Sequence, residues 1–498
     1  MTENDPIDVL ICGAGAAGLT LALDLARRGV SFRLIEKSGT PFVGSRGKGI
    51  QPRTQEVFED LGILDAIAAM GSPYPPHRNH RQDGGYEEVQ DVVIEAPTAQ
   101  EPYRSMLLVP QFVTEGVMRS RLAGLGAAPE FGHELVAFEE HGDGVTASVE
   151  SPKGRHRQRC RYLVGADGGR SFVRSALGVD FPGQTLGVRA IVADLELDGL
   201  ARDAWHWFNR GEMAQQISFC PLPRSGLFQL QAPIRAEGEP DLSVAGLQAF
   251  VDSRVPAGSV SVRAVPWASA YTMNARLADR YRAGRVLLVG DAAHVHPPTG
   301  AQGLNTSVQD AYNLGWKLSA VLAGAPEALL DTYEEERRPI AAGMLGLASE
   351  MLDRARRGNL RRDREVAQLD LDYAWSSLSL PIDDDGRLHA GARAPDVRLR
   401  GAGGQPRRLF DLTRGTHWTW IVHGRPVATL PPERRGLRVH HVAAEGEYAD
   451  EDGAMATVYG LRDGDHLLIR PDGYVAAIVD RDGGGKVFDH LASALPSR

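Results

Sequence analysis

The chain has 498 residues, of which 43% are hydrophobic and 24% charged, as in a soluble globular protein with two or three domains. A formal net charge of −9 argues against nucleic acid or an anionic membrane surface as the main partner. The three cysteines lack the spacing of a metal site or a disulfide framework, and no apolar segment is long enough to span a bilayer. We therefore expect a cytoplasmic protein without a signal peptide, a membrane contact or a metal.

The first predicted elements form a strand–turn–helix–strand unit. An apolar strand at 7–12 leads into a glycine-rich turn and a helix at 19–28, and a second strand at 32–35 ends on Glu36. Such glycines let the backbone approach a pyrophosphate, and the acid can accept a hydrogen bond from a ribose without a 2′-phosphate. The alternative, a plain glycine-rich turn, leaves the acid unexplained. The turn consists of Gly13, Ala14, Gly15, Ala16, Ala17 and Gly18.

A second strand-to-helix turn follows at 162–174. The apolar strand 162–165 runs into Asp167 and two glycines, after which a helical segment begins. Asp167 either contacts a cofactor or caps the helix that follows, and the sequence leaves both interpretations open.

Between about residues 184 and 268 the hydrophobic pattern changes to a period of two. Residues 215–220 and 227–232 are predicted strands, separated by a proline-rich segment and a turn. We expect an antiparallel sheet inserted into the nucleotide-binding domain. Core packing explains most of its aromatic residues equally well: Trp205, Trp207, Phe208, Phe219 and Phe228.

The strongest motif spans residues 285–305. An apolar strand at 285–290 places Asp291 at its carboxyl end, and a double proline and glycines precede a helix that starts near Leu304. A helix start offers free backbone N–H groups and a positive end to a cofactor that develops negative charge. His294 and His296 have no third ligand nearby, so a metal site is not expected.

The last part of the chain is predicted to form a separate unit. Arg337-Arg338-Pro339 is expected to end one helix, and a charged helical pattern follows at about 341–364. A turn-rich linker at 381–386 then introduces alternating short strands and helices, with elements at 418–422, 454–459 and 467–476. This unit contains no cysteine, which excludes thiol redox exchange and favours a packing or association role.

Together, the three turns resemble those of FAD-dependent aromatic hydroxylases built like para-hydroxybenzoate hydroxylase, the single-component flavoprotein monooxygenases. The nearest similarity is to the actinomycete hydroxylases of aromatic polyketide antibiotics. The resemblance implies an α/β fold: a discontinuous Rossmann-like FAD-binding domain, an inserted antiparallel β-sheet substrate domain and a C-terminal thioredoxin-like domain. The expected ranges are 1–183 and 269–380 for the FAD-binding domain with a helical extension, 184–268 for the substrate domain, and 388–498 for the thioredoxin-like domain.

The resemblance also implies roles for individual residues. The 13–18 turn would cradle the FAD pyrophosphate, Glu36 would take the adenosine ribose, its neighbour Lys37 would also contact the cofactor, and Asp291 would bind the ribityl or pyrophosphate region. The start of the helix near 304 would face the flavin pyrimidine edge, and the two prolines would line the substrate side. The further residues are Arg46, Gln111, Asp167, Pro297, Pro298, Gly303, Leu304 and Asn305. We assign no catalytic base.

The implied function is hydroxylation of a bulky, phenolic aromatic substrate with O2, through a flavin C4a-hydroperoxide. The electron donor would be NADPH or NADH, visiting transiently, because no second complete glycine motif is present. Two alternatives remain: a Baeyer–Villiger oxygenase acting on a polycyclic ketone, and a flavin reductase or dehydrogenase without oxygen insertion. A flavoprotein scaffold without catalysis is a third, which the intact motifs oppose. A homodimer is a further expectation.

Overall fold

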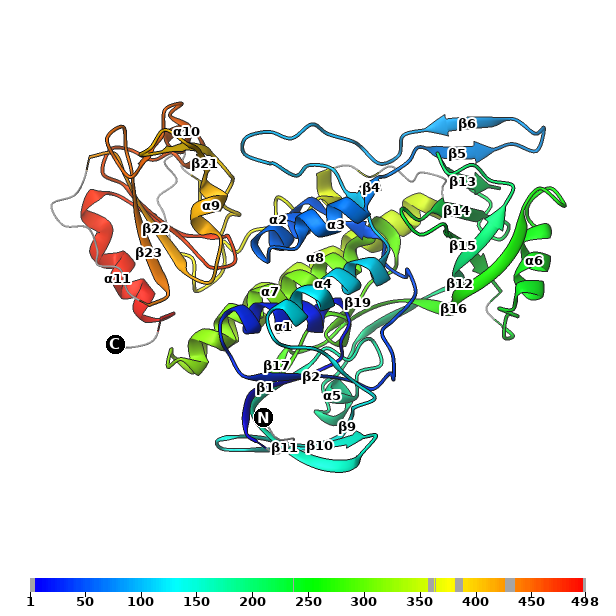
Figure 1. The fold of residues 1–498 in the computed structure, drawn as a ribbon, viewed down its shortest axis with the longest axis horizontal. Helices are drawn as coiled ribbons and strands as arrows, with labels where there is room; N and C mark the ends of the chain where they lie inside the picture. Colours follow the sequence, from blue (N-terminus) through cyan, green and yellow to red (C-terminus); the bar gives the residue numbers. More distant parts are fainter. Residues whose placement is uncertain are drawn as a thin grey trace.

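The computed structural model describes residues 5–235, 237–356, 362, 364–380, 388–425 and 435–495. The main sheet contains β1 (Ile7–Cys12), β2 (Phe32–Glu36), β8 (Glu130–Phe131), β9 (Glu134–His141), β10 (Gly144–Ser151), β11 (Gly154–Gly165), β17 (Arg282–Ala283) and β18 (Val286–Leu288). Its order is β17-β18-β11-β1-β2-β8, with β10 and β9 continuing from β11 (Figure 1). The run from β18 to β8 is parallel, as in Rossmann-like folds.

Helices from distant parts of the sequence pack together beside this sheet. They are α1 (Ala16–Arg27), α2 (Pro52–Asp60), α3 (Leu64–Met70), α4 (Gln111–Gly124), α7 (Gln302–Leu322) and α8 (Asp331–Arg356), whereas α5 (Phe172–Ala176) packs against β9 and β11. Helix α1 lies between α4 and α7 (Figure 1). Its residues from Ala16 to Leu25 are all buried, and the apolar ones share one hydrophobic core with β1 and α7. Burial on all sides explains why most of α1 is apolar, and its one buried charge, Asp24, is paired with Arg27 and Arg28.

A second sheet is antiparallel except at one pair of strands. It contains β5 (His77–His80), β6 (Tyr86–Val89), β12 (Gly183–Asp198), β13 (Trp205–Phe208), β14 (Ile217–Pro221), β15 (Phe228–Ile234), β16 (Ser261–Leu277) and β19 (His294–Val295), with α6 (Val244–Asp252) beside it. The order is β19-β16-β12-β15-β14-β13-β5-β6, and only β13 and β5 pair in parallel. The α/β fold with an inserted antiparallel sheet is therefore confirmed. The sheet also recruits residues 77–89, which lie outside the expected 184–268.

One helix boundary was predicted wrongly. Helix α8 continues through Pro339 to Arg356 instead of ending at Arg338. Proline removes the N–H that would bond to the carbonyl oxygen of Glu335, four residues earlier. That carbonyl oxygen accepts a hydrogen bond from Trp375 Nε1 at 3.0 Å instead. A side chain from outside the helix thus replaces the lost donor.

Short elements complete the main body. A small sheet joins β3 (Gly49–Ile50), β7 (Leu107–Leu108) and β4 (Ser72–Pro73). Single 3-10 turns occur at η1 (Gly290–Ala292), η2 (Thr299–Ala301), η3 (Glu327–Leu330), η4 (Arg364–Val366) and η5 (Arg481–Gly483).

Over residues 388–425 and 435–495, the C-terminal unit is a mixed sheet with three helices. It contains β20 (Arg398–Gly401), β21 (Pro406–Arg408), β22 (Trp418–His423), β23 (Leu437–Val442), β24 (Tyr448–Ala449), β25 (His466–Ile469) and β26 (Val475–Val479), with α9 (Leu409–Thr413), α10 (Ala454–Tyr459) and α11 (Gly484–Ala492). The order is β21-β20-β24-β23-β22-β25-β26, and β22 pairs with β23 in parallel. The segment predicted as one closing strand at 467–476 forms a hairpin. A thioredoxin-like fold stays a prediction, and the linker at 381–386 lies outside the described residues.

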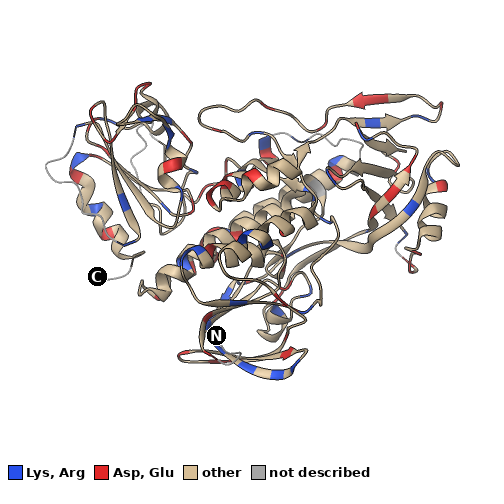
Figure 2. Ribbon diagram, in the orientation of Figure 1, with Lys and Arg blue, Asp and Glu red and all other residues tan. Residues whose placement is uncertain are grey.

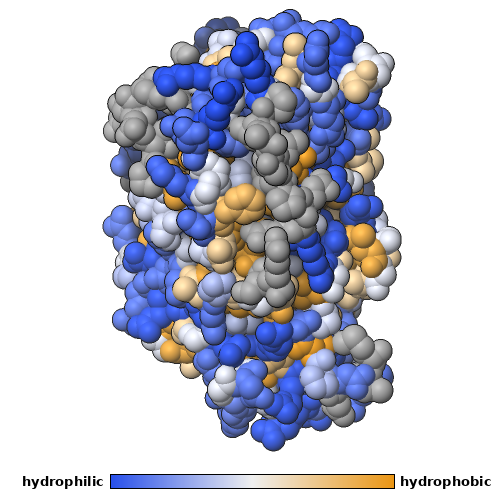
Figure 3. Space-filling view, turned by 90° about the vertical axis from the view of Figure 1, so that its left-hand side faces the viewer, coloured by the Kyte–Doolittle hydropathy of each residue, from blue (hydrophilic) through white to orange (hydrophobic). Residues whose placement is uncertain are grey.

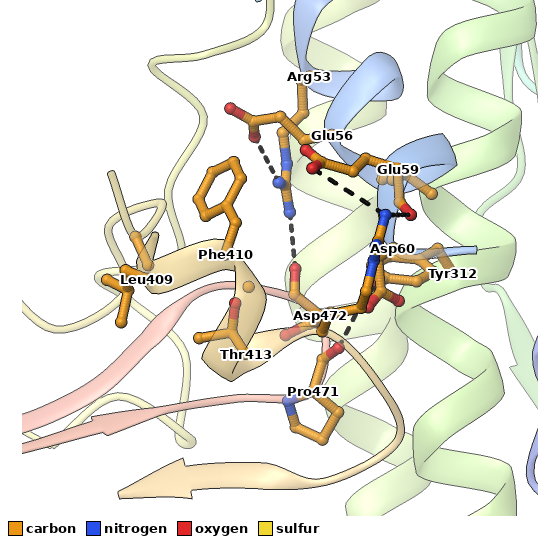
Figure 4. Close-up of a pocket in the computed structure, with 14 residues that line it drawn as sticks. Arg53, Glu56, Glu59, Asp60, Tyr312, Leu409, Phe410, Thr413, Pro471 and Asp472 are labelled. Carbon is orange, nitrogen blue, oxygen red and sulfur yellow. Dashed lines mark hydrogen bonds and ion pairs between the residues drawn. The ribbon is translucent and has the colours of Figure 1, made fainter. Parts of the chain in front are cut away.

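Buried charges dock the C-terminal unit onto the main body. Arg470 donates two hydrogen bonds to Glu336, at 2.6 and 2.8 Å, and neither side chain is exposed. Lys317 Nζ lies 2.6 Å from the same carboxylate. Figure 4 shows a second contact across a recess between the units, where Arg53 of α2 donates to the carbonyl oxygen of Asp472. A buried carboxylate needs such partners, so separating the two units would leave Glu336 without its Arg470 partner.

Charges of both signs are distributed over the described surface. Figure 2 shows acidic and basic residues interspersed along the same helices and strands. Figure 3 shows the face that carries the C-terminal unit, where hydrophilic side chains cover most of the described area. Among the described helices, none has the length and apolar character needed to cross a bilayer.

Candidate active site

Three parallel strands end at the same level on one edge of the main sheet. Cys12 at the end of β1 pairs with Gly165 at the end of β11, and Gly165 pairs with Leu288 at the end of β18. The alignment continues beyond the strands, because Ala166 N donates to Cys12 O at 2.8 Å and Val289 N donates to Gly165 O at 3.0 Å. The three predicted turns therefore lie side by side at the carboxyl edge, where open parallel sheets bind ligands.

The 13–18 turn leaves backbone N–H groups free for an anion. Gly13 has a φ of +108°, and a Cβ there would lie 2.2 Å from Ala166 O, so glycine is required. A Cβ on Gly18 would lie 1.9 Å from Gly13 O. Gly15 is the N-cap of α1 and has no side chain that could cap this helix, while the Glu115 carboxyl lies near the first turn. Free N–H groups and the positive helix end suit a pyrophosphate.

Glu36 lies at the end of β2, beside this turn. Its Oε2 accepts a hydrogen bond from Ala14 N at 2.9 Å, and its Oε1 accepts one from Ser38 N at 2.9 Å. Each carboxylate oxygen can accept a second hydrogen bond, so a ribose hydroxyl can still be bound. The neighbouring Lys37 is exposed. The ribose contact of Glu36 and the cofactor contact of Lys37 stay predictions.

Gln111 links the 44–50 loop to α4. Its Oε1 accepts from Gly47 N at 2.9 Å, and its Nε2 donates to Glu115 Oε1 at 2.8 Å. Burial raises the pKa of the Glu115 carboxyl to about 7, although the Gln111 hydrogen bond and the charge of Arg119 oppose this shift. Sequence reasoning missed Glu115, whose signal was its position four residues after Gln111 on one helix face.

Asp291 and Arg46 lie at the rim of this edge. Asp291 is exposed on one side, while protein atoms surround it on the others, and this desolvation raises the pKa of its carboxyl. The charges of His294 and Arg46 act in the opposite direction. The Arg46 guanidinium is exposed and lies 5.9 Å from the centroid of the Phe42 ring. A carboxylate and a guanidinium here suit hydroxyl and diphosphate groups.

Asp167 caps the helix that follows it. Ser171 Oγ donates to its Oδ1 at 2.5 Å, and Val173 N donates to its Oδ2 at 3.1 Å. The structure thus shows the capping role that the sequence left open. A contact between Asp167 and a cofactor stays a prediction.

The start of α7 approaches the 44–50 loop. Ala301 adopts a left-handed conformation with φ of +56° and no side chain caps the helix, so its first N–H groups are available. Asn305 holds the loop in place, because its Oδ1 accepts from Gln51 N at 2.8 Å and its Nδ2 donates to Gly49 O at 2.8 Å. A Cβ on Gly303 would meet nothing within 4 Å, so this backbone is open to close approach. Leu304 lies against Gly47.

His294 and His296 take part in a buried hydrogen-bond network. His294 Nε2 lies 2.6 Å from Asp310 Oδ2, and Arg337 Nε donates to Asp310 Oδ1 at 2.8 Å. The two histidine Nδ1 atoms lie 3.3 Å apart. Within the described ranges, no group of three or more histidine, cysteine or acidic side chains is arranged to hold a metal ion.

A cavity of about 880 Å³, counting the space at its mouth, joins the 290–305 segment to the second sheet. Pro298 and Gly300 line it from one side, and Trp205, Trp207 and Tyr271 line it from the sheet. Pro297 is buried and is not among the residues that line this cavity, so its place beside flavin and substrate stays a prediction. The tryptophans thus belong to the cavity, whereas Phe208, Phe219 and Phe228 pack in the core of the sheet.

The chain matches the FAD binding domain family over residues 6–348 and the aromatic-ring hydroxylase C-terminal family over residues 388–497. It belongs to the FAD-dependent aromatic hydroxylases. The hydroxylase is 41% identical to a flavin-dependent monooxygenase from Mycobacteroides abscessus, over 98% of this chain and 100% of that protein. It is 36% identical to 12-dehydrotetracycline 5-monooxygenase/anhydrotetracycline 6-monooxygenase from Streptomyces rimosus, over 98% of each.

A solved structure shows the same arrangement. The crystal structure of aklavinone-11 hydroxylase with FAD and aklavinone matches this hydroxylase with a TM-score of 0.83 and 28% identity, over 99% of this chain and 100% of that one. The hydroxylase is therefore an FAD-binding monooxygenase. Its residues fit the cofactor, because uncapped helix starts, glycines that permit close approach and the exposed Asp291 meet at one edge.

Proposed function

We propose that this hydroxylase adds one oxygen atom from O2 to a phenolic ring of a polycyclic aromatic substrate. The observation that carries the proposal is the cavity shared by Pro298, Gly300 and the aromatic residues of the second sheet. A flat substrate in this space would lie between aromatic side chains and the turn that approaches the flavin. The lining of the cavity is largely apolar and aromatic with a few polar side chains, as in sites that bind flat ring molecules.

The names of the relatives support this substrate class. Anhydrotetracycline and aklavinone, which two of them act on or bind, are fused-ring aromatic compounds. Both relatives align over nearly the whole chain, including the second sheet and the C-terminal unit. We infer a substrate of the aromatic polyketide type and a role in antibiotic biosynthesis or modification.

The proposed FAD contacts follow the geometry of the edge. The 13–18 turn would hold the pyrophosphate, Glu36 and Lys37 the adenosine ribose, and Arg46 and Asp291 the diphosphate and ribityl region. Gln111, Asp167 and the 303–305 helix start would contribute the remaining contacts. Bound FAD supplies the oxygen activation. The chain itself positions the ring, excludes water from the cavity and stabilises developing charge with the helix start.

The electron donor in this proposal is NADPH or NADH, which reduces the flavin in a transient encounter. We further propose a homodimer, the domain boundaries given above and a thioredoxin-like fold for residues 388–498. Size-exclusion chromatography with light scattering measures the molar mass in solution and so tests the homodimer. A donor comparison at equal concentration identifies the preferred nicotinamide.

Oxygen incorporation tests the proposed function. Purified FAD-bound protein is incubated with NADPH and a panel that includes anhydrotetracycline and aklavinone, under labelled O2. The proposal predicts faster NADPH oxidation with at least one fused-ring phenol, and a product carrying one labelled oxygen as a ring hydroxyl by NMR. An ester or lactone product would indicate Baeyer–Villiger chemistry. Oxidation without labelled product would indicate a dehydrogenase.

A further inference from the structure

One wall of the cavity carries a histidine–carboxylate pair that none of the sequence motifs includes. His77 opens β5, the strand that extends the second sheet beyond the expected range, and its ring lines the cavity beside Trp205 and Trp207. His77 Nδ1 lies 2.7 Å from Asp91 Oδ2. The exposed fractions of His77 and Asp91 are 1% and 6%, so both are shielded from bulk water. Such a pair, placed where a substrate binds, is suited to proton transfer.

The second ring nitrogen of His77 is available. Both ring nitrogens are buried and make no well-directed hydrogen bond with the residues that the structure describes; Nδ1 has Asp91 Oδ2 at 2.7 Å, whereas Nε2 has no such contact. Buried polar atoms are normally paired, so an unpaired one at a cavity wall points to a partner supplied by a ligand. The ring centroids of Trp205 and Trp207 lie 4.7 and 5.6 Å from that of His77. An aromatic ring packed on these indoles would bring its hydroxyl close to the imidazole.

The surrounding charges favour a neutral imidazole beside an ionised carboxylate. Burial lowers the pKa of His77, the nearby charges of Arg362 and Arg210 add to this, and the adjacent Asp91 carboxylate opposes it. Burial alone would raise the pKa of Asp91, but His77 and Arg210 outweigh it and hold that pKa below its usual range. Arg210 fixes Asp91 directly, at 2.8 Å. Near neutral pH, His77 is therefore ready to accept a proton.

We propose that His77 is the catalytic base of the hydroxylation and that Asp91 holds it in position. Nε2 accepts the proton of a phenolic hydroxyl, and the electron pair stays on the ring oxygen. The ring becomes richer in electrons at its ortho and para carbons, one of which forms the C–O bond with one oxygen atom of O2. The O–O bond breaks and the other oxygen atom leaves as water, with two electrons supplied by NADPH or NADH through FAD. The imidazolium returns the proton to the same oxygen when the oxygenated ring regains aromaticity by losing its carbon-bound proton to water. This inference rests on the proposed function, since it takes the cavity as the substrate site.

A coloured phenol tests the proposal without knowledge of the natural substrate. The probe is 1,2-dihydroxyanthraquinone, a planar three-ring phenol whose visible absorption changes on ionisation. Its pH titration is recorded when bound to FAD-loaded wild type, His77→Gln, Asp91→Asn and His80→Gln. His80 is the matched control, because it lies on the same strand and bonds His206 instead of lining the cavity. FAD content and unfolding temperature verify that each variant is folded.

The proposal predicts that the wild-type protein lowers the pH of dye ionisation by about one unit or more relative to His77→Gln. Asp91→Asn should give an intermediate value, and His80→Gln should match the wild type. With a substrate, hydroxylation by His77→Gln should fall about 100-fold at neutral pH, and the acidic limb of the wild-type pH profile should disappear.

Two results would overturn the assignment, and they are distinguishable. If the dye binds the wild type and His77→Gln with the same ionisation pH, His77 is not the base, although the cavity remains the substrate site. If the dye does not bind the wild type, or Trp207→Ala binds it equally well, the cavity itself is misassigned and the proposed function fails with it. If His77→Gln does not fold, the Asp91→Asn variant tests the proposal instead. If the bound dye ionises at the same pH in Asp91→Asn as in the wild type, Asp91 and His77 do not act together as the base.

Discussion

A Cβ placed on Gly290 would lie 3.1 Å from the Cβ of Ala17, so the third turn lies in direct contact with α1, the helix that follows the first turn. The same Cβ would lie 2.9 Å from Ser307 Cβ in α7. Gly290 also has a φ of +61°, which side chains other than glycine rarely adopt. This one position therefore joins the two strongest sequence motifs, and a methyl group there must push them apart.

We predict that Gly290→Ala weakens FAD retention and lowers the unfolding temperature. The matched control is Gly29→Ala, because Gly29 has a similar φ of +71° but nothing within 4 Å of an added Cβ. The control isolates the backbone cost, about 1–3 kcal/mol for a strained φ. Thermal release of FAD, followed by flavin fluorescence, should occur earlier in Gly290→Ala than in the control. Equal behaviour of the two variants would mean that the turns do not press on each other.

Glu115 should make stability depend on pH. Its folded pKa of about 7 lies above that of an unfolded glutamate, about 4.3, so the folded state binds the additional proton between these values. The stabilisation that the protonated Glu115 gives the folded state is complete below the pKa of glutamate in the unfolded chain. It is lost as the pH rises through the folded pKa of about 7. Glu115→Gln should therefore gain stability relative to the wild type between pH 5 and 8, by up to about 1.4 kcal/mol per unit of pKa shift.

Urea unfolding at several pH values measures this difference. The exposed Glu139→Gln serves as the control, since its side chain is 71% exposed and should leave the pH dependence unchanged. A pH profile of Glu115→Gln parallel to that of the wild type would show that the buried carboxyl is already ionised.

The buried Glu336 should be essential for docking of the C-terminal unit. Glu336→Ala leaves the charges of Arg470 and Lys317 buried without their carboxylate, which costs about 3–5 kcal/mol in comparable sites. Glu350→Ala on the same helix removes an exposed partner of Arg354 and should cost less than about 1 kcal/mol. Tryptophan fluorescence during urea unfolding gives the free energy of unfolding of both variants. Equal losses of stability in Glu336→Ala and Glu350→Ala would refute a structural role for the buried network.

Local patterns in the sequence were sufficient to predict where the strands end and where the turns lie. Apolar runs, glycines and acids such as Glu36 and Asp291 lie within a few residues of one another, and the backbone geometry at each turn follows from them. The parallel register of β1, β11 and β18 then brings the turns together. Residues of the same motif can still differ in exposure, as the buried Pro297 and the exposed Pro298 show.

Long-range partners could not be predicted in the same way. The Glu335 carbonyl oxygen accepts its hydrogen bond from Trp375, and the Glu336 carboxylate accepts one from Arg470, and both donors lie far along the chain. The hairpin at 77–89 is polar and short, so its place at the edge of the second sheet left no hydrophobic pattern. His77 and Asp91 escaped notice for that reason, because only pairing with β13 brings this segment to the cavity.

The most direct test of the account is the affinity of Asp291→Ala for FAD. Fluorescence quenching of free FAD by apoprotein gives the Kd of the wild type, of this variant and of the control Asp489→Ala, which alters an exposed residue of α11. We predict that Asp291→Ala raises the Kd for FAD at least about tenfold over the wild type, equal to about 1.4 kcal/mol. The control variant should keep the wild-type Kd, and the circular dichroism of both variants should be unchanged. An unchanged Kd in a folded Asp291→Ala protein would contradict the convergence of the three turns on FAD.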